Sequence, residues 1–296
     1  MQKLLIKGKR KLSGSIPISG SKNATLPILA ACIFSQRVKI ENIPLVKDVF
    51  TMIELLNFIG LKVKINKKNN SLEIVNTKKT LNSIAPYNLV KTMRAGVLVL
   101  GPLLAKHKKA KVSLPGGCAI GTRPVDLHLY VLKKLGAKIK IKNGYIHASA
   151  RNGLKGCKIR FPSISVGATE NAILAAAQAS GKTVLSNCAI EPEVKDLIFF
   201  LKKIGCKINF KGRKIEIFGK FEPLEKTYKV MFDRIEAGTY LIASAIAGKK
   251  ISLLNVNHKV IQTEIKILKT MGNPTLVGPI GSGQVSKLAN QIVVGV

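Results

Sequence analysis

The chain has 296 residues, of which 46% are hydrophobic, and this content excludes a disordered or fibrous protein. It carries 49 Lys and Arg residues against 15 Asp and Glu residues, and the net charge of +34 favours anionic partners. The longest mostly apolar stretches, 26–34 and 95–105, are shorter than the roughly 18 residues that a membrane-spanning helix needs. The Lys-rich start lacks the apolar region of a secretion signal, so we expect a soluble, cytoplasmic protein with no membrane partner.

The basic residues are spread along the whole chain. Aromatic residues make up 5% of the sequence, with no Trp, whereas nucleic-acid surfaces usually combine clustered Lys and Arg with stacking aromatic side chains. Many lysines alternate with apolar residues, as in 138–142 and 62–65, a pattern typical of a strand with one face in water. We therefore predict solvated sheet faces and no nucleic-acid partner, with a cationic nucleic-acid groove as the alternative.

Four segments of helical pattern end in an apolar residue followed by glycine, and they mark a degenerate repeat. The intervals between Gly60, Gly136, Gly205 and Gly272 are 76, 69 and 67 residues. A strand-like run with alternating lysines follows each of the first three glycines. The intervals are too long for a solenoid and predict a repeated βαβαββ module.

A second helix-like segment, rich in small and apolar residues, precedes each of these marker helices. The four segments span 24–34, 90–105, 167–180 and 235–247, and a β-like run follows each of them. Helices with so little polar surface must be buried. We therefore expect an α/β fold in which these helices pack together inside an outer layer of sheets.

The repeat pattern is not recognisable in the sequence after Gly272. Residues 272–296 contain one charged residue, Lys287, and five glycines. We therefore predict a complete three-repeat domain over 22–232, a partial second domain formed by 1–21 plus 233–271, and a tail of different origin over 272–296.

The loop at residues 114–128 has the most distinctive local sequence, LPGGCAIGTRPVDLH. Its glycines and prolines predict a shaped loop that displays Cys118, and the nearby Arg123 favours the thiolate form of that cysteine. The other four cysteines lie in apolar or strand-like contexts, where a packed side chain is the ordinary interpretation. A catalytic cysteine and an accidental loop cysteine are both consistent with this pattern.

The remaining candidate segments are less specific. Residues 18–24 form a glycine turn that delivers Lys22 and Asn23 to the start of an apolar helix, either as an anion site or as a simple N-cap. Residues 233–236 (DRIE) read as a capping box or as a site. The cysteine and histidine spacings predict neither a disulfide framework nor a metal site.

Six segments taken together resemble a known family: 19–23, 89–94, 115–128, 165–171, 191–193 and 233–236. They are similar to the UDP-N-acetylglucosamine 1-carboxyvinyltransferases, which are enolpyruvyl transferases, over residues 1 to about 271. The resemblance implies an inside-out α/β barrel of two domains, here truncated in the second domain. It also implies transfer of the enolpyruvyl group of phosphoenolpyruvate to the 3′-hydroxyl of UDP-N-acetylglucosamine in peptidoglycan synthesis, without a cofactor.

The resemblance also implies roles for individual residues. Cys118 matches the acid that protonates the methylene carbon and forms an adduct with phosphoenolpyruvate, and Lys22 and Arg123 match catalytic positions that hold phosphate and carboxylate. The positions that match contacts to the UDP-sugar are Asn23, Arg94, Arg123, Pro124, Val125, Asp126, Leu127, Ser163, Ile164, Ser165 and Val166. Ser163 departs from the basic residue common in the family.

Two departures from the family lead to further expectations. The later repeats of the family supply an aspartate and an arginine, and no residue of this sequence matches either of them. We therefore expect impaired activity, with non-catalytic UDP-sugar binding as the alternative. The sister enzyme that acts on shikimate 3-phosphate does not use a loop cysteine, which argues against that substrate. Residues 278–290 resemble part of the β-hydroxyacid dehydrogenases, from which we predict a fused or misassembled reading frame.

Overall fold

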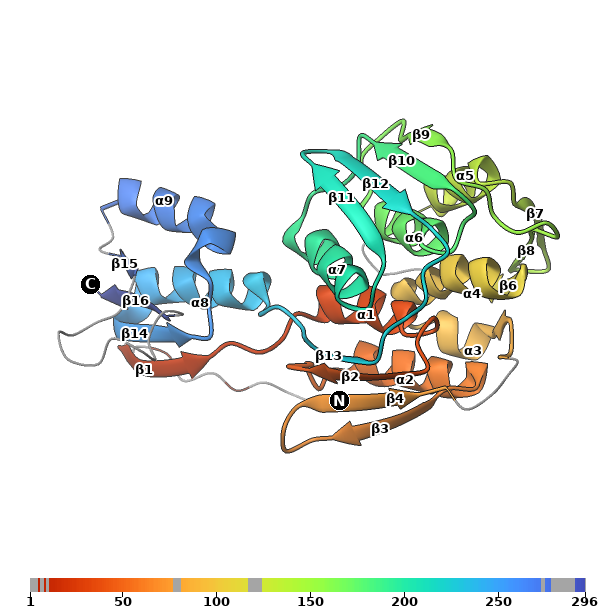
Figure 1. Cartoon of the computed structure of the whole chain (residues 1–296). Helices are drawn as coiled ribbons and strands as arrows, with labels where there is room; N and C mark the ends of the chain where they lie inside the picture. Colours follow the sequence, from red (N-terminus) through yellow and green to blue (C-terminus); the bar gives the residue numbers. More distant parts are fainter. Residues whose placement is uncertain are drawn as a thin grey trace. The chain divides into compact units, whose positions relative to one another are not determined.

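The computed structural model describes residues 11–76, 81–116, 124–272, 275–277 and 291–295, together with Leu5 and Gly8. The chain divides into two compact units. Residues 21–231 form the three-repeat unit, and residues 1–20 with 232–296 form the single-repeat unit. Within the described parts of the chain, the strands form four sheets of four strands each (Figure 1), and no helix is long and apolar enough to cross a membrane.

The three-repeat unit follows the predicted order of elements. Its first repeat consists of α1 (Lys22–Ala31), β2 (Arg37–Glu41), α2 (Lys47–Ile59), β3 (Lys62–Asn66) and β4 (Ser71–Val75). Its second repeat consists of β5 (Ile84–Ala85), α3 (Tyr87–Val90), η1 (Arg94–Val99), α4 (Leu100–His107), β6 (Lys109–Ser113), α5 (Asp126–Lys134), β7 (Lys138–Lys142) and β8 (Tyr145–Ser149). Its third repeat consists of β9 (Lys158–Arg160), α6 (Val166–Ala176), β10 (Lys182–Ser186), α7 (Pro192–Lys203), β11 (Lys207–Lys211) and β12 (Lys214–Phe218), and β13 (Lys226–Lys229) follows.

The glycines that mark the repeats end their helices in the predicted way. Gly60 caps α2 with a φ of 118°, and Gly136, Gly205 and Gly272 have φ values of 98°, 108° and 82°. This left-handed region is open to glycine at little cost, so each glycine stops a helix and turns the chain toward the next strand.

One predicted helix is wrong in its extent. The segment 90–105 is not continuous but is divided into α3, the 3₁₀ helix η1 and α4. Pro102 lacks the N–H that would bond to the Leu98 carbonyl, and its ring clashes with that carbonyl in a continuous α-helix. A new helix can begin at Leu100 because Pro102 then lies in the first turn.

The sheets share one topology. In each sheet, the strand that follows the small-residue helix has two neighbours. One is a parallel strand, and the other is the second strand of the hairpin, which is antiparallel to it, as in the order β5-β6-β8-β7. The parallel strand of the first repeat is β13, which pairs with β2 from the far end of the unit. This pairing closes the three-repeat unit on itself in space.

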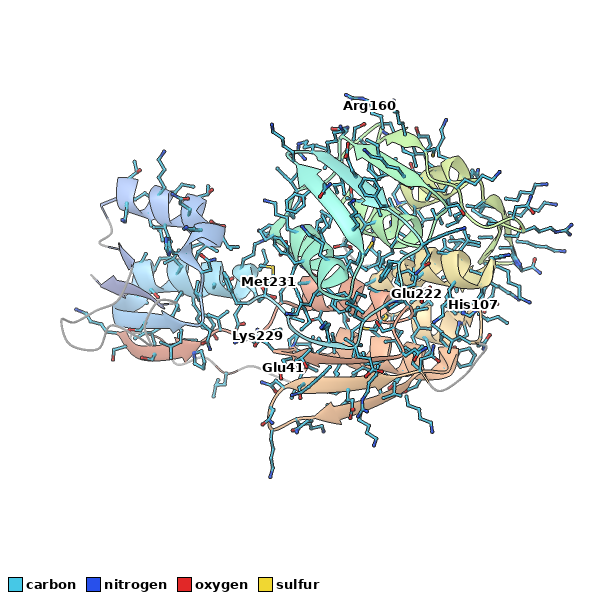
Figure 2. The ribbon with its side chains drawn as sticks, viewed as in Figure 1. Glu41, His107, Arg160, Glu222, Lys229 and Met231 are labelled. Carbon is cyan, nitrogen blue, oxygen red and sulfur yellow. The ribbon has the colours of Figure 1, made fainter. Side chains whose placement is uncertain are left out.

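The small-residue helices form the core of this unit, as predicted. Every residue of α1 from Ala24 to Ala31 and every residue of α6 from Ala168 to Ala176 is buried. In Figure 1 the sheet containing β2 lies along the bottom of the unit and the sheet containing β10 along the top, with α1 and α6 between them. Lysines at alternate positions of β3 and β7 are exposed, and Figure 2 shows nitrogen-tipped side chains projecting outward from the sheets.

The single-repeat unit contains β1 (Leu12–Pro17), α8 (Arg234–Ala247), β14 (Gly248–Leu254), η2 (His258–Ile261), α9 (Gln262–Thr270), β15 (Thr275–Val277) and β16 (Gln291–Gly295). Its sheet has the order β1-β14-β16-β15, with β1 parallel to β14. The strands β16 and β15 hold the positions that β4 and β3 hold in the first repeat. The strand pattern therefore continues past Gly272, which the sequence pattern did not indicate, while a separate origin for 272–296 stays a prediction.

Candidate active site

Lys22 and Asn23 begin the buried helix α1. The Ser21 hydroxyl accepts a hydrogen bond from the Ala24 N–H at 3.3 Å, which confirms the N-cap interpretation of this turn. Lys22 Nζ lies 3.1 Å from Asp48 Oδ2 at the start of α2, and 43% of the lysine side chain is exposed. Asp48, which the sequence did not single out, thus holds an accessible ammonium group beside the helix start.

A second group surrounds the buried imidazole of His128 on α5. Asn171 of α6 donates from Nδ2 to the Val97 carbonyl of η1 at 3.2 Å, and the same nitrogen lies 3.1 Å from His128 Nδ1. The Val97 carbonyl, which also accepts the Leu100 N–H, would repel the amide oxygen of Asn171, so Nδ2 faces it and directs its second hydrogen to the imidazole nitrogen. One amide therefore joins η1, α5 and α6.

Several predicted substrate-binding residues lie at the starts of these same elements. Arg94, Asp126 and Val166 are the first residues of η1, α5 and α6. Arg94 and Asp126 both act electrostatically on His128, and a Cβ on Gly167 would lie 3.3 Å from the His128 ring. The structure therefore brings three of the predicted segments together at His128.

The other predicted residues fit around this cluster. Ser165 caps α6 by accepting from the Ala168 N–H at 3.3 Å. Helix α1 packs against both η1 and α6, which places the element carrying Lys22 next to those carrying Arg94 and Val166. The remaining predicted residues keep solvent access, either exposed or half-buried: Asn23, Pro124, Val125, Leu127, Ser163 and Ile164.

Cys118 and Arg123 lie outside the described residues, but the two ends of their loop are described. A Cβ on Gly116 would lie 2.1 Å from the Lys91 carbonyl, so the loop leaves β6 in close contact with the turn before Arg94. At the other end, Pro124 leads directly into α5. Both ends of the loop thus lie beside the elements that carry the His128 cluster.

The four described cysteines are poor nucleophiles. Cys32, Cys188 and Cys206 are buried, as the sequence indicated, and Cys157 is half-buried. Burial raises the pKa of the Cys188 and Cys206 thiols to about 12. The pKa values of Cys32 and Cys157 are also raised by burial. A reactive thiolate is therefore not expected at any of these four positions.

Two of the segments that carried the resemblance meet at a buried carboxyl group. Glu170 of α6 is 5% exposed, and burial, together with Glu193 and Glu191, raises its pKa well above the ordinary value. Sequence reasoning assigned no role to these acids, because only folding reveals that 165–171 and 191–193 are neighbours. Among the described residues, no group of three His, Cys, Asp or Glu side chains is arranged to hold a metal ion.

The segment 233–236 has a capping role in the single-repeat unit. Asp233 Oδ1 accepts hydrogen bonds from the N–H groups of Ile235 at 2.8 Å and Glu236 at 3.1 Å, at the start of α8. Glu236 accepts from the N–H and the hydroxyl of Ser19, not from the Asp233 N–H as a reciprocal capping box would require. The segment therefore joins the residues that follow β1 to the start of α8.

We predict that His128 makes the three-repeat unit sensitive to acid. Burial, aided by Arg94, lowers its pKa from 6.5 to about 4. Because this folded-state value lies below the unfolded value, the neutral imidazole stabilises the fold above pH 6.5, and that stability is lost as the pH falls toward 4. The shift corresponds to about 3 kcal/mol. Urea unfolding across this range should show a smaller acid loss for His128→Gln than for the unchanged chain.

The carboxyl group of Asp196 provides a control, because its contribution to stability changes with pH in the opposite direction to that of His128. Burial raises its pKa from 3.8 to about 6 against the hydrogen bonds from Tyr228 and Met231. Its contribution therefore falls as the pH rises through the same range, so Asp196→Asn should steepen the acid loss that His128→Gln reduces. Equal acid profiles for the His128→Gln and unchanged chains would contradict the assignment to His128.

Comparison with known proteins identifies the family. The family model for EPSP synthase (3-phosphoshikimate 1-carboxyvinyltransferase) matches residues 6–292. A Pelagibacter ubique protein named UDP-N-acetylglucosamine 1-carboxyvinyltransferase is 57% identical over 275 residues, covering 92% of this chain and 65% of that protein. A Rickettsia akari protein of the same name is 48% identical, with 96% of this chain and 68% of that protein covered. The chain thus spans about two thirds of the length of these relatives.

Solved structures agree on the fold. The enolpyruvyl transferase NikO from Streptomyces tendae superposes with a TM-score of 0.82 at 20% identity, covering 97% of this chain and 66% of that chain. EPSP synthase from Acinetobacter baumannii gives 0.76 at 17% identity, with coverage of 97% and 65%. The mixed α/β architecture is therefore that of the enolpyruvyl transferases, as predicted. From the family match and the identity of the relatives, the chain belongs to the EPSP synthase (3-phosphoshikimate 1-carboxyvinyltransferase) family of enolpyruvyl transferases.

Proposed function

We propose that the chain binds UDP-N-acetylglucosamine and phosphoenolpyruvate and transfers the enolpyruvyl group to the 3′-hydroxyl of the sugar. The observation that carries this proposal is the 57% identity to a relative named for that reaction. The arrangement of Arg94, Asp126 and the start of α6 around His128 supports it, because the predicted sugar-binding segments are neighbours in the fold. The reaction would belong to peptidoglycan synthesis in the cytoplasm, and through it to cell shape and division.

The residue types present suit the chemistry. The sugar hydroxyl gives its proton to water and adds to C2 of phosphoenolpyruvate, while an acid, Cys118, gives its thiol proton to the C3 methylene group. Return of a C3 proton to the Cys118 thiolate then expels inorganic phosphate and leaves the enolpyruvyl ether. Lys22 and Arg123 would hold the phosphate and carboxylate of phosphoenolpyruvate by charge-assisted hydrogen bonds. Arg94 would face the diphosphate of the nucleotide sugar.

Two observations favour this acceptor over shikimate 3-phosphate. The relatives that match with high identity are named for the nucleotide sugar, whereas the likeness to EPSP synthase structures is at 17% identity and concerns the fold. The loop also carries Cys118 in the Gly-Gly-Cys context, for which the shikimate enzyme has no use. The cysteine therefore distinguishes the two acceptors.

Single-turnover release of phosphate tests the proposal. With the chain in excess over phosphoenolpyruvate, we expect phosphate only when UDP-N-acetylglucosamine is present, and none with shikimate 3-phosphate. Cys118→Ala should abolish the release, whereas Cys157→Ala, a matched cysteine that is half-buried and has a raised pKa, should preserve it. Calorimetric binding of the nucleotide sugar without any phosphate release would instead support the UDP-sugar-binding alternative.

A further inference from the structure

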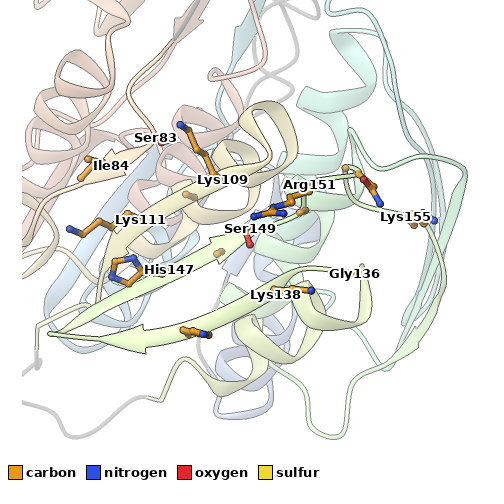
Figure 3. Close-up of a pocket in the computed structure, with 16 residues that line it drawn as sticks. Ser83, Ile84, Lys109, Lys111, Gly136, Lys138, His147, Ser149, Arg151 and Lys155 are labelled. Atoms are coloured by element: carbon orange, nitrogen blue, oxygen red, sulfur yellow. The ribbon is translucent and has the colours of Figure 1, made fainter.

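A cavity of about 990 Å³ lies on the outer face of the sheet β5-β6-β8-β7, within the three-repeat unit. Six cationic side chains line it, and we name this group the cation pocket: Lys109, Lys111, Lys138, Lys140, Arg151 and Lys155. Figure 3 labels five of them: Lys109 and Lys111 on β6, Lys138 on β7, and Arg151 and Lys155 in the segment after β8. No carboxylate is found among the described residues that line it. None of the residues assigned to the proposed active site belongs to the pocket.

The strand register arranges four of the lysines in two rows. Lys109 and Lys138 both pair with Ser149 of β8, which therefore lies between them. Lys111 and Lys140 flank His147 in the same way, two residues further along. Strands are about 4.8 Å apart and same-face residues about 6.7 Å apart, so the four lysines surround Ser149 and His147. The ammonium group of Lys111 lies over the Tyr145 ring, 4.7 Å from its centre.

The other two repeats of the three-repeat unit carry a carboxylate where this sheet has His147. In the first repeat, Glu73 of β4 holds the register position of His147 and pairs with Lys39 and Lys64. These two lysines are equivalent to Lys111 and Lys140. Arg37, Lys39 and Lys64 all contribute to lowering the Glu73 pKa. The first sheet is equally rich in lysine at these positions, but Glu73 offsets their charge. The cation pocket therefore differs from the rest of this lysine-rich chain in lacking such a carboxylate.

In the third repeat, a carboxylate again offsets the charge of the lysines. Glu216 of β12 holds the equivalent register position, and its carboxylate lies 2.9 Å from the ammonium groups of both Lys182 and Lys214. Lys182 and Lys207 also lie over the Phe218 ring, at 5.2 Å and 4.8 Å. Of the three sheets of this unit, the one that carries the cation pocket has neither the central acid nor an aromatic ring at the Ser149 position.

From this juxtaposition we propose that the cation pocket binds a linear polyphosphate. The pocket is concave, with six cations around neutral hydrogen-bond donors, which matches a compact ligand that carries several negative charges on oxygen atoms. No Phe, Tyr or Trp is found among the described residues that line it, whereas nucleic-acid grooves commonly use such rings to stack bases. Ser149 and Asn152 supply neutral donors for oxygens between the charged groups.

Titration calorimetry with sodium tripolyphosphate tests the proposal on the full chain at about 0.1 M salt, where screening of surface charges is moderate. The test variant is Lys138→Glu with Lys140→Glu. Its matched control is Lys62→Glu with Lys64→Glu, at equivalent exposed positions of β3 and with the same change in net charge. We expect the β7 pair to weaken binding at least ~10-fold and the β3 pair to weaken it no more than ~2-fold.

A third variant supplies the missing acid. His147→Glu introduces the residue type of the first and third repeats at that register position and should weaken tripolyphosphate binding by at least ~10-fold. Equal losses in the β7 and β3 pairs would overturn the proposal in favour of the general field of the chain. So would tighter binding, through the same lysines, of oligothymidylate or of vesicles rich in phosphatidylglycerol.

Discussion

Lys22→Gln is expected to lower the single-turnover rate of phosphate release on the order of 10²–10³-fold, the usual loss when one charged donor at a reacting group is removed. Lys22 is proposed to help hold the phosphate and carboxylate of phosphoenolpyruvate, and its ammonium group lies 3.1 Å from Asp48 with 43% of the side chain exposed. An ion pair this exposed contributes about 0–1 kcal/mol to folding. The loss should therefore appear in the rate while the thermal midpoint stays nearly constant.

The matched control is Lys39→Gln. Lys39 also pairs with a carboxylate, Glu41 at 2.7 Å, and half of its side chain is exposed. It lies on the outer face of the sheet at β2, so its loss should leave the rate unchanged. Lys22→Arg keeps the charge and should recover part of the activity. A rate for Lys22→Gln within a few-fold of the unchanged chain would remove Lys22 from the phosphate site.

The repeat was predictable because its signals are local. A helix that ends in glycine at positive φ, followed by lysines alternating with apolar residues, needs no distant partner to be recognised. Gly60 and Gly205 behave in this way at φ values of 118° and 108°. Burial of α1 and α6 was also predictable, because a helix without polar surface can be stable in water only when other elements cover it.

The site needed the tertiary structure. Asn171 contacts Val97 of η1, 74 residues away in the sequence, and His128 of α5, 43 residues away. Contacts over such separations leave no recognisable pattern in the sequence. The pairing of β13 with β2 closes the three-repeat unit, and it too connects the ends of a long segment. The signal for dividing 90–105 before α4, Pro102, was visible in the sequence but was outweighed by the apolar run around it. Cys118 lies outside the described residues, so its role stays a prediction.

Gly101→Ala is expected to destabilise the three-repeat unit on the order of 3 kcal/mol, through overpacking where α4 crosses α6. A Cβ at this position would lie 2.3 Å from Asn171 Oδ1, 2.8 Å from the Asn171 carbonyl oxygen and 3.2 Å from the Ala175 nitrogen. The two backbone atoms cannot rotate away, so α6 must shift, and the Asn171 bonds to Val97 and His128 are disturbed with it. Alanine gains about 1 kcal/mol over glycine in helix propensity, which is too little to compensate. Urea unfolding followed by circular dichroism measures the difference.

Gly238→Ala is the matched control for this substitution. Gly238 lies inside α8, no atom lies within 4 Å of a Cβ built there, and its φ is ordinary for a helix. The same change of residue should therefore stabilise its helix by about 0.5–1 kcal/mol. The two substitutions differ in the space around the added methyl group, so opposite signs would show that the contact between α4 and α6 sets the cost. A Gly101→Ala chain as stable as the unchanged one would mean that the two helices are not packed this closely in solution.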